Sequence, residues 1–247
     1  MLLTHDLERS IIKKTCSHID NTNHQYKTLM RANIVTHPIP YFGCLSKAEV
    51  ATLGLNPSSK EFTKNRNWPK IISEEELRER LCGYFYSVNP PPHRFFEPWS
   101  RALVHINASY KNDTVHLDLS PRATRAAGQF GSDPLRSRFL EMLREDAHIW
   151  IEAVEAMKSL KIILAAGSAT KKYYINEFIK SELSDRGVRL EGDWRRGKGS
   201  GQTAFHTLIL PSGRQLPMFF CSSGPAKPLD LIRAIQTHAL RIKNLRE

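Results

Sequence analysis

The sequence predicts an α/β protein: a three-layer α/β/α domain whose central, mostly parallel sheet has four to five strands. Three observations lead to this prediction. The chain has 247 residues, of which 40% are hydrophobic, and this is enough to bury the core of one large domain. Its apolar runs are strand-sized and alternate with helix-compatible segments, which favours a parallel sheet covered by helices. No run reaches the ~18 apolar residues that a membrane span needs.

Five segments are expected to form strands, because short apolar runs in them end at Gly, Pro, Asn or Ser. They are residues 47–55, 114–120, 161–166, 207–210 and 216–221. The first ends in the turn Gly54-Leu55-Asn56-Pro57-Ser58, where the proline and the residue before it stop the strand. The last two flank a Pro-Ser-Gly turn, which indicates a hairpin or a strand pair.

Six segments are expected to be helical, and one of them, residues 135–157, fits either one long helix or two. They are residues 4–31, 74–81, 97–107, 135–157, 169–183 and 229–245. The run Asn89-Pro90-Pro91-Pro92 predicts a stiff extended loop, and residues 192–203 a basic loop rich in glycine. We assign residues 1–247 to a single domain with an N-terminal helical extension (1–35) and an insertion (60–82).

The charge balance is the first indication of function. The chain carries 36 Lys and Arg against 25 Asp and Glu, a formal net charge of +11. Such a surface attracts polyanions such as nucleic acids, although many basic proteins simply carry solvated basic faces. The first residues lack a basic segment followed by an apolar one, so we expect no secretory signal and a cytoplasmic location.

The cysteines indicate neither disulfides nor a metal site. Cys16, Cys44, Cys82 and Cys221 show no C-x-x-C and no zinc-finger spacing. They are expected to be reduced, partly buried thiols. No cofactor and no metal are predicted.

Ligands of parallel α/β sheets bind beyond the carboxyl ends of the strands. Polar residues stand there in this sequence: Asn56 after the first strand, Asp118 and Ser120 at the end of the second, and Ser222-Ser223-Gly224 after the last. We therefore expect these side chains to form the functional site.

The second strand alternates strictly, with His116, Asp118 and Ser120 facing one way. A strand covered by helices on both sides is normally apolar on both faces, so this polar face needs a reason. It indicates a pocket lined by Asp118 and Ser120, or an edge strand with one wet face. A third reading, that His116 and Asp118 are half of a metal site, lacks a second cluster of ligands.

Two further segments have both a functional and a plain structural interpretation. The aromatic run Tyr84-Phe85-Tyr86 lies beside the proline loop, where it offers a stacking face for a base or belongs to the core. The basic residues Arg195, Arg196 and Lys198 stand among glycines and could close over phosphates, or lie in a surface loop. Their spacing is not that of a phosphate-binding P-loop.

Taken in order, five segments resemble motifs of the uracil-DNA glycosylase superfamily. Residues 51–58 resemble the water-positioning motif, and residues 83–92 resemble the segment with the base-stacking aromatic and the proline-rich loop. Residues 117–121 resemble the base-reading strand, and residues 163–172 resemble the apolar strand with its Gly-Ser turn. Residues 221–227 stand where the family carries its second motif. The resemblance spans residues 40–241. It implies a uracil-DNA glycosylase-like fold and an enzyme that removes a base from DNA.

The sequence departs from the family pattern at three positions. The second motif has no histidine where His-Pro-Ser is common, so the neutral hydroxyls of Ser222 and Ser223 stand in its place. Asn56 replaces the Asp of the most active branch, and water activation should be weaker. The base-reading position carries Asp118 instead of Asn.

The third departure changes the expected base. An Asn donates to O4 of uracil and accepts from N3–H, whereas an ionised Asp only accepts. Cytosine presents an N4 amino donor, from which acidic side chains accept. A protonated Asp118 could instead donate to N3 of cytosine. Asp118 therefore predicts a cytosine-type base.

The resemblance implies a role for each matching residue. Asn56 would position the attacking water, Asp118 and Ser120 would line the base pocket, and Tyr86, or else Phe62, would stack on the base. The expected DNA contacts are Pro90, Pro91, Pro92, Ser168, Arg195, Arg196, Lys198, Ser222, Ser223 and Lys227.

These roles predict a monofunctional DNA glycosylase, because no lysine is obviously placed for a Schiff base. Its substrate would be a modified cytosine, such as the glucosylated hydroxymethylcytosine of phage DNA that anti-phage members of the superfamily remove. The run Asn65-Arg66-Asn67-Trp68 in the insertion suits a glucosyl group, or is part of a solvated lid. DNA, from phage or damaged, is the expected partner, with no membrane and no obligate protein partner.

Two alternatives stay open. The first is a repair enzyme that excises uracil or another deaminated base. The second is a non-catalytic binder of modified or damaged DNA, which the missing motif histidine favours.

Overall fold

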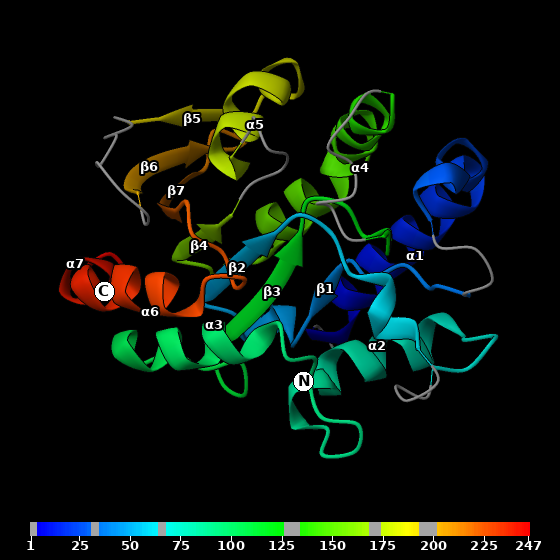
Figure 1. Ribbon diagram of the computed structural model, residues 1–247, viewed down its shortest axis with the longest axis horizontal. Coiled ribbons are helices and arrows are strands. Elements are labelled where there is room, and N and C mark those ends of the chain that lie inside the picture. The colour runs from blue at the N-terminus through cyan, green and yellow to red at the C-terminus, as the bar shows by residue number, and fades with distance from the viewer. Residues whose placement is uncertain (1–3, 31–34, 64–67, 126–133, 168–173, 193–201) are drawn as a thin grey trace.

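A seven-stranded mixed sheet forms the centre of the molecule (Figure 1). The computed structural model describes residues 4–30, 35–63, 68–125, 134–167, 174–192 and 202–247. The strand order is β1-β3-β2-β4-β7-β6-β5. The strands are β1 (Tyr41–Phe42), β2 (Val50–Gly54), β3 (Thr114–Asp118), β4 (Ile162–Ala166), β5 (Arg189–Glu191), β6 (Thr203–Ile209) and β7 (Gln215–Cys221).

The mostly parallel centre of the sheet is confirmed, and the predicted number of strands is wrong. β2 pairs in parallel with β3 and β4, and β4 pairs in parallel with β7. The prediction of four to five strands missed β1 and β5, which pair antiparallel at the two edges. These strands have only two and three residues, so their sequences are too short to show a period.

The predicted hairpin is confirmed as β6 and β7, and β6 begins earlier than expected. The two strands pair antiparallel from Thr203↔Cys221 to Ile209↔Gln215. The connecting turn closes with Leu210 N–H donating to the carbonyl of Arg214 over 2.9 Å. Gly213 in this turn has φ 84°, a left-handed conformation that glycine adopts without strain.

The predicted helices are present with changed bounds. They are α1 (Thr4–Thr22), α2 (Glu74–Gly83), α3 (Phe96–Leu103), α4 (Leu135–Ala156), α5 (Ile175–Glu182), α6 (Pro228–Thr237) and α7 (Ala239–Asn244). The segment for which one or two helices were possible is the single helix α4. The C-terminal segment forms two helices, α6 and α7, which meet at His238.

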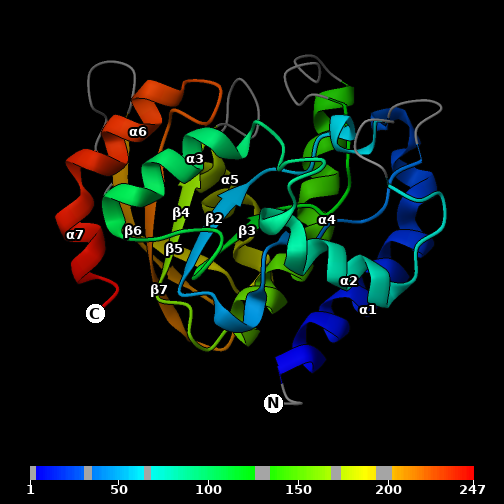
Figure 2. The same ribbon diagram turned by 90° about the horizontal axis from the view of Figure 1, so that it is seen from below.

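Helices cover both faces of the sheet. On β7, the ring of Phe219 contacts His238 at the end of α6, whereas Phe220 contacts Tyr174 at the start of α5. Neighbouring strand residues point to opposite faces, so α6 and α5 lie on opposite sides. Helix α3 packs beside α6, as Figure 2 shows, and an ion pair between Arg144 and Glu182 joins α4 to α5.

The centre of the sheet is buried on both faces. Every residue of β2, β3 and β4 is buried. The interpretation of the second predicted strand as an edge strand with one wet face is wrong, because β3 pairs with β1 on one side and β2 on the other. None of the helices that the structure describes is long and apolar enough to cross a membrane.

Candidate functional site

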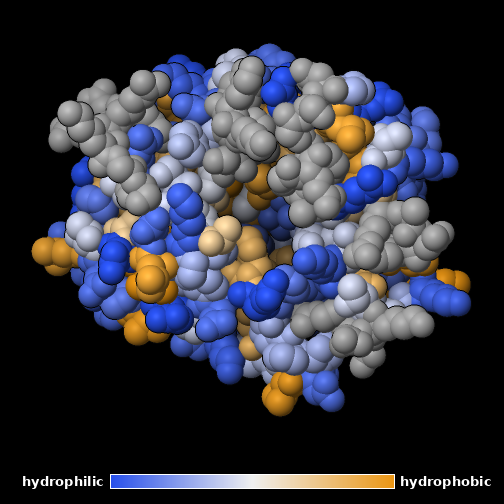
Figure 3. All heavy atoms as spheres, viewed as in Figure 1, coloured by the Kyte–Doolittle hydropathy of each residue, from blue (hydrophilic) through white to orange (hydrophobic). Residues whose placement is uncertain are grey.

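A cavity of about 840 Å³ opens at the carboxyl ends of the four parallel strands. Its walls come from residues 53–58 at the end of β2 and beyond it, Asp118 of β3, Ala166 and Gly167 at the end of β4, 222–227 after β7, and 93–96 at the start of α3. The face of the molecule in Figure 3 is hollowed near its middle, with hydrophobic residues along the hollow. The fold thus brings together the strand-end residues that the sequence singled out, except Ser120.

Asn56 lies in the wall of this cavity with its amide orientation set by the backbone. Its Nδ2 donates to the carbonyl oxygens of Pro57 (2.9 Å) and Arg122 (3.1 Å) and to the hydroxyl of Thr124 (2.8 Å). The donor end of the amide is therefore occupied. What Asn56 can offer a ligand or a water is its acceptor oxygen Oδ1.

Asp118 lies in the same wall, packed against a glycine. Its side chain is 6% exposed, and His116 Nε2 lies 3.4 Å from Oδ1. A Cβ on Gly54 would stand 2.5 Å from Asp118 Oδ1 and 3.0 Å from His116 Nε2. Only a glycine at this position of β2 leaves room for both side chains, so Gly54 is part of the site.

A buried chain of hydrogen bonds holds His116 from behind. Its Nδ1 lies 2.7 Å from the hydroxyl of Thr52, which in turn lies 2.7 Å from the hydroxyl of Tyr110. Burial raises the pKa of Tyr110 well above its ordinary value, so this hydroxyl keeps its proton. The imidazole of His116 is therefore oriented, and it lies beside Asp118 in the cavity wall.

The turn after β7 brings three predicted residues to the opposite wall. Ser222, Ser223 and Lys227 all line the cavity. Ser222 N–H donates to the carbonyl of Gln202 over 2.8 Å, and the hydroxyl of Ser223 donates to Asp230 of α6 over 3.4 Å. These contacts hold the turn in place, and the exposed side chain of Lys227 leaves its charge at the cavity mouth.

Residues 93–96 were missed by the sequence analysis and lie in the cavity wall. Phe95 is half-buried, and its ring lies 5.4 Å from that of His116. His93 Nδ1 accepts a hydrogen bond from Phe95 N–H over 3.2 Å, which leaves Nε2 to carry the proton of a neutral ring. The sequence feature that could have indicated these residues is their position directly after the proline run, as His93-Arg94-Phe95-Phe96.

Among the residues that the structure describes, four exposed cations line the cavity: Lys60, Arg94, Arg125 and Lys227. Only Lys227 was expected to contact DNA. The four come from four separate segments, so no charge run in the sequence indicates them. Two acidic side chains, Glu61 and Asp118, lie among the same lining residues and are buried.

Four groups of predicted site residues do not line the cavity. Tyr86 is 62% exposed, and its hydroxyl donates to the carbonyl of Lys111. Phe62 is buried against Trp68, with ring centroids 5.0 Å apart. Pro90 lines a second, smaller cavity. Pro91 and Pro92 follow Pro90 in the sequence and line neither cavity.

Ser120 forms the fourth group of predicted site residues that does not line the cavity. It is fully buried, and its hydroxyl donates to Asp146 of α4 over 2.6 Å. The chain turns after β3, so the alternation that placed Ser120 beside Asp118 ends at Asp118. The base-pocket role expected for Ser120 does not fit this position. Ser168, Arg195, Arg196 and Lys198 lie outside the described residues.

The second cavity adjoins the first through Glu61, which lines both. It measures about 320 Å³, and Trp68 and Arg80 form part of its wall. The guanidinium of Arg80 lies 5.6 Å from the centre of the Trp68 ring. The rest of the insertion motif, residues 65–67, lies outside the described residues.

In the described part of the chain, no third metal-ligating side chain stands with His116 and Asp118, so the hypothesis that these two residues are half of a metal site gains no support. There, the one group of three metal-ligating side chains within 4.8 Å of each other is Glu8, Cys44 and Cys82. It lies elsewhere in the fold. Comparison with protein-family models, curated proteins and solved structures found no match for this chain.

Proposed function

We propose that the protein is a DNA glycosylase that hydrolyses the N-glycosidic bond of a flipped, modified cytosine and leaves an abasic site. The observation that carries the proposal is the convergence of Asn56 and Asp118, from two different strands, on one cavity at the carboxyl end of the sheet. A nucleotide must leave the base stack to reach such a recess.

Asp118 would read the base. Its carboxylate, backed by His116, offers acceptors to the N4 amino group of cytosine. In its protonated form the same carboxyl group would donate to N3 as the base leaves. Phe95 would supply the stacking face that the sequence analysis assigned to Tyr86, because it is the half-buried ring beside Asp118 and His116.

Asn56 would hold the water. With Nδ2 occupied by the backbone, Oδ1 accepts a hydrogen bond from a water and directs the water oxygen at C1′. The new C1′–O bond forms as the C1′–N1 bond breaks, its electron pair passes to the base, and the proton of the water ends on the base. The transition state has oxocarbenium character.

The size and charge of the site support a modified nucleotide in DNA. Ligand pockets span about 300–1,000 Å³, and 840 Å³ lies near the upper end of this range. The four exposed cations around the cavity would hold the phosphates on either side of the flipped nucleotide. A sugar on the base would reach the second cavity, where Trp68 offers an aromatic face and Arg80 a donor.

The test compares matched oligonucleotides that carry one cytosine, uracil, 5-hydroxymethylcytosine or glucosylated 5-hydroxymethylcytosine. After incubation, alkali cuts the strand at any abasic site, and the products are separated by size. We expect cutting of the glucosylated oligonucleotide first and of uracil least. Efficient cutting at uracil would contradict the cytosine assignment and favour the repair alternative.

Asn56→Ala is expected to abolish cutting while DNA binding persists. Asn112→Ala is the matched control, because this exposed amide does not line the cavity. Full activity of Asn56→Ala would overturn the water-holding role.

A non-catalytic binder of modified DNA is the second candidate. It is favoured by the three acceptors around Asn56 Nδ2, which would also suit a purely structural amide. Tight, modification-dependent binding with no abasic site on any of the four oligonucleotides would establish it.

A further inference from the structure

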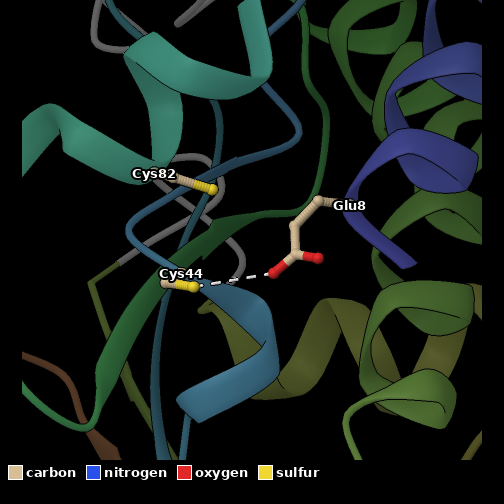
Figure 4. Close-up of side chains that lie close together, drawn as sticks. All are labelled: Glu8, Cys44 and Cys82. Carbon is tan, nitrogen blue, oxygen red and sulfur yellow. Dashed lines mark hydrogen bonds between the residues drawn. The ribbon is translucent and has the colours of Figure 1, made fainter. Parts of the chain in front are cut away.

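Three potential metal ligands gather at the β1 edge of the sheet, away from the large cavity (Figure 4). Glu8 comes from α1, Cys44 follows β1, and Cys82 lies in the last turn of α2. None of the three lines either of the cavities described above. The sequence gives no sign of this cluster, since 36 residues separate Glu8 from Cys44.

Glu8 is the unusual member. Its side chain is 1% exposed, and Oε1 accepts from Ser46 N–H over 3.0 Å and from the Cys44 thiol over 3.6 Å. The other oxygen, Oε2, is buried with no hydrogen-bond partner. A buried carboxylate with an unmatched oxygen is costly unless a cation or donor completes it. Figure 4 shows this carboxylate and both sulfur atoms directed at one another.

We propose that Glu8, Cys44 and Cys82 bind a zinc ion. Thiolates with a carboxylate are a ligand set that Zn²⁺ accepts in tetrahedral geometry. Zn–S and Zn–O distances of about 2.3 and 2.0 Å place two such ligand atoms roughly 3.5 Å apart. The Cys44 sulfur and Glu8 Oε1 are 3.6 Å apart, and all three ligand atoms lie within 4.8 Å of one another.

The charge of the ligand set suits a divalent cation. Zinc is bound by thiolates, so its binding releases the protons of the two thiols. Two thiolates and a carboxylate leave one excess negative charge around Zn²⁺, and the guanidinium of Arg78, which is paired with Glu75, lies near enough to reduce it.

The fourth position has a candidate in Tyr41 of β1. Its hydroxyl is buried with no hydrogen-bond partner. This hydroxyl would fill the fourth position of a tetrahedral zinc ion or hold a water there. The ion would tie α1 and α2 to the edge strand of the sheet, which is a structural role independent of the proposed glycosylase activity.

Cobalt(II) titration of the reduced, full-length protein tests the site, because thiolate-bound Co²⁺ absorbs strongly in the near ultraviolet. We expect one equivalent to bind with tetrahedral visible bands, and Zn²⁺ to displace it. Loss of a group that only hydrogen-bonds to a metal ligand weakens metal binding by roughly 10–100-fold. Cys44→Ser or Cys82→Ser removes a ligand itself and should therefore weaken Co²⁺ binding by more than this. Glu8→Gln should lose at least about tenfold.

Cys16→Ser is the matched control, since this half-buried thiol of α1 lies outside the cluster. Its affinity should equal that of the parent protein, and circular dichroism of each metal-free variant verifies that it folds. Equal Co²⁺ affinity in the parent and in folded Cys44→Ser would overturn the proposal. So would a Cys44–Cys82 disulfide in the untreated protein, seen as a mass lower by two hydrogens.

Discussion

Two buried aspartates, Asp146 and Asp118, have opposite surroundings. Asp146 of α4 is 0% exposed, and it accepts from Ser120 Oγ (2.6 Å) and Arg122 Nε (2.9 Å) and contacts His18 Nε2 (2.7 Å). Asp118 is 6% exposed, and His116 Nε2 lies 3.4 Å from its Oδ1. Asp146 is enclosed, whereas Asp118 lines the large cavity.

The difference separates a structural carboxylate from one available to a ligand. Asp146 joins α1, α4 and the segment after β3, and its oxygens are matched by donors of the chain itself. Asp118 keeps acceptor capacity for something that enters the cavity. Buried polar groups are normally satisfied, so an incompletely matched carboxylate in a cavity wall is a functional candidate. Four substitutions test this comparison.

The largest effect is expected from Asp146→Ala. Removing one partner of a buried ion pair leaves the other charge uncompensated, which typically costs about 3–5 kcal/mol. The free energy of unfolding, measured by urea denaturation, should fall by this amount. Glu152→Ala, which removes the exposed pair with Lys14, should cost no more than about 1 kcal/mol. Equal losses in the two variants would contradict the structural role of Asp146.

Gly54→Ala should have the next largest effect. The new Cβ would lie 2.5 Å from Asp118 Oδ1, so the carboxylate must move, at a cost of about 1–3 kcal/mol. Glycosylase activity should fall with it. Gly83→Ala is the control, because nothing lies within 4 Å of its added Cβ. A Gly54→Ala variant with parental stability and activity would show that Asp118 is not packed as described.

Asp118→Asn should leave the free energy of unfolding within about 1 kcal/mol of the parent value, since the contact of Asp118 with His116, at 3.4 Å, is longer than an ordinary hydrogen bond. Its effect should appear in the ratio of cutting at modified cytosine to cutting at uracil. A matched polar contact discriminates bases by about 1–3 kcal/mol, which predicts a shift of about 5- to 150-fold toward uracil. Asp185→Asn, at an exposed position, is the control. An unchanged ratio would remove Asp118 from base reading.

The smallest effect concerns pH. Burial lowers the pKa of His206, so the folded protein binds this proton less readily than the unfolded chain. Its contribution to stability is complete above the unfolded pKa of about 6.5 and is lost as the pH falls through the lower folded value. His206→Gln should therefore flatten the decline of melting temperature below that pH, and exposed His24→Gln should not. An identical decline in both variants would contradict this assignment.

The parts of the fold that the sequence predicted are those with a long local signal. The four central strands and the hairpin follow from apolar runs of several residues, and Asn56 and Asp118 from their positions where such runs end. Ser120 was misplaced because alternation was extended past the end of β3. Tyr86 and Phe62 were singled out and Phe95 was missed, because the sequence does not show to which side an aromatic side chain will point.

By itself, the sequence determined the class of the fold and the end of the sheet at which the polar residues gather, since strand period and chain direction are local properties. Only the tertiary structure decided which aspartate is hydrogen-bonded on all sides and which faces a cavity. Asp146, for example, contacts His18, which is 128 positions away in the sequence. The same holds for the four cations around the cavity and for Glu8 with its two cysteines. Their proximity depends on how distant elements pack, and no pattern within a single segment records it.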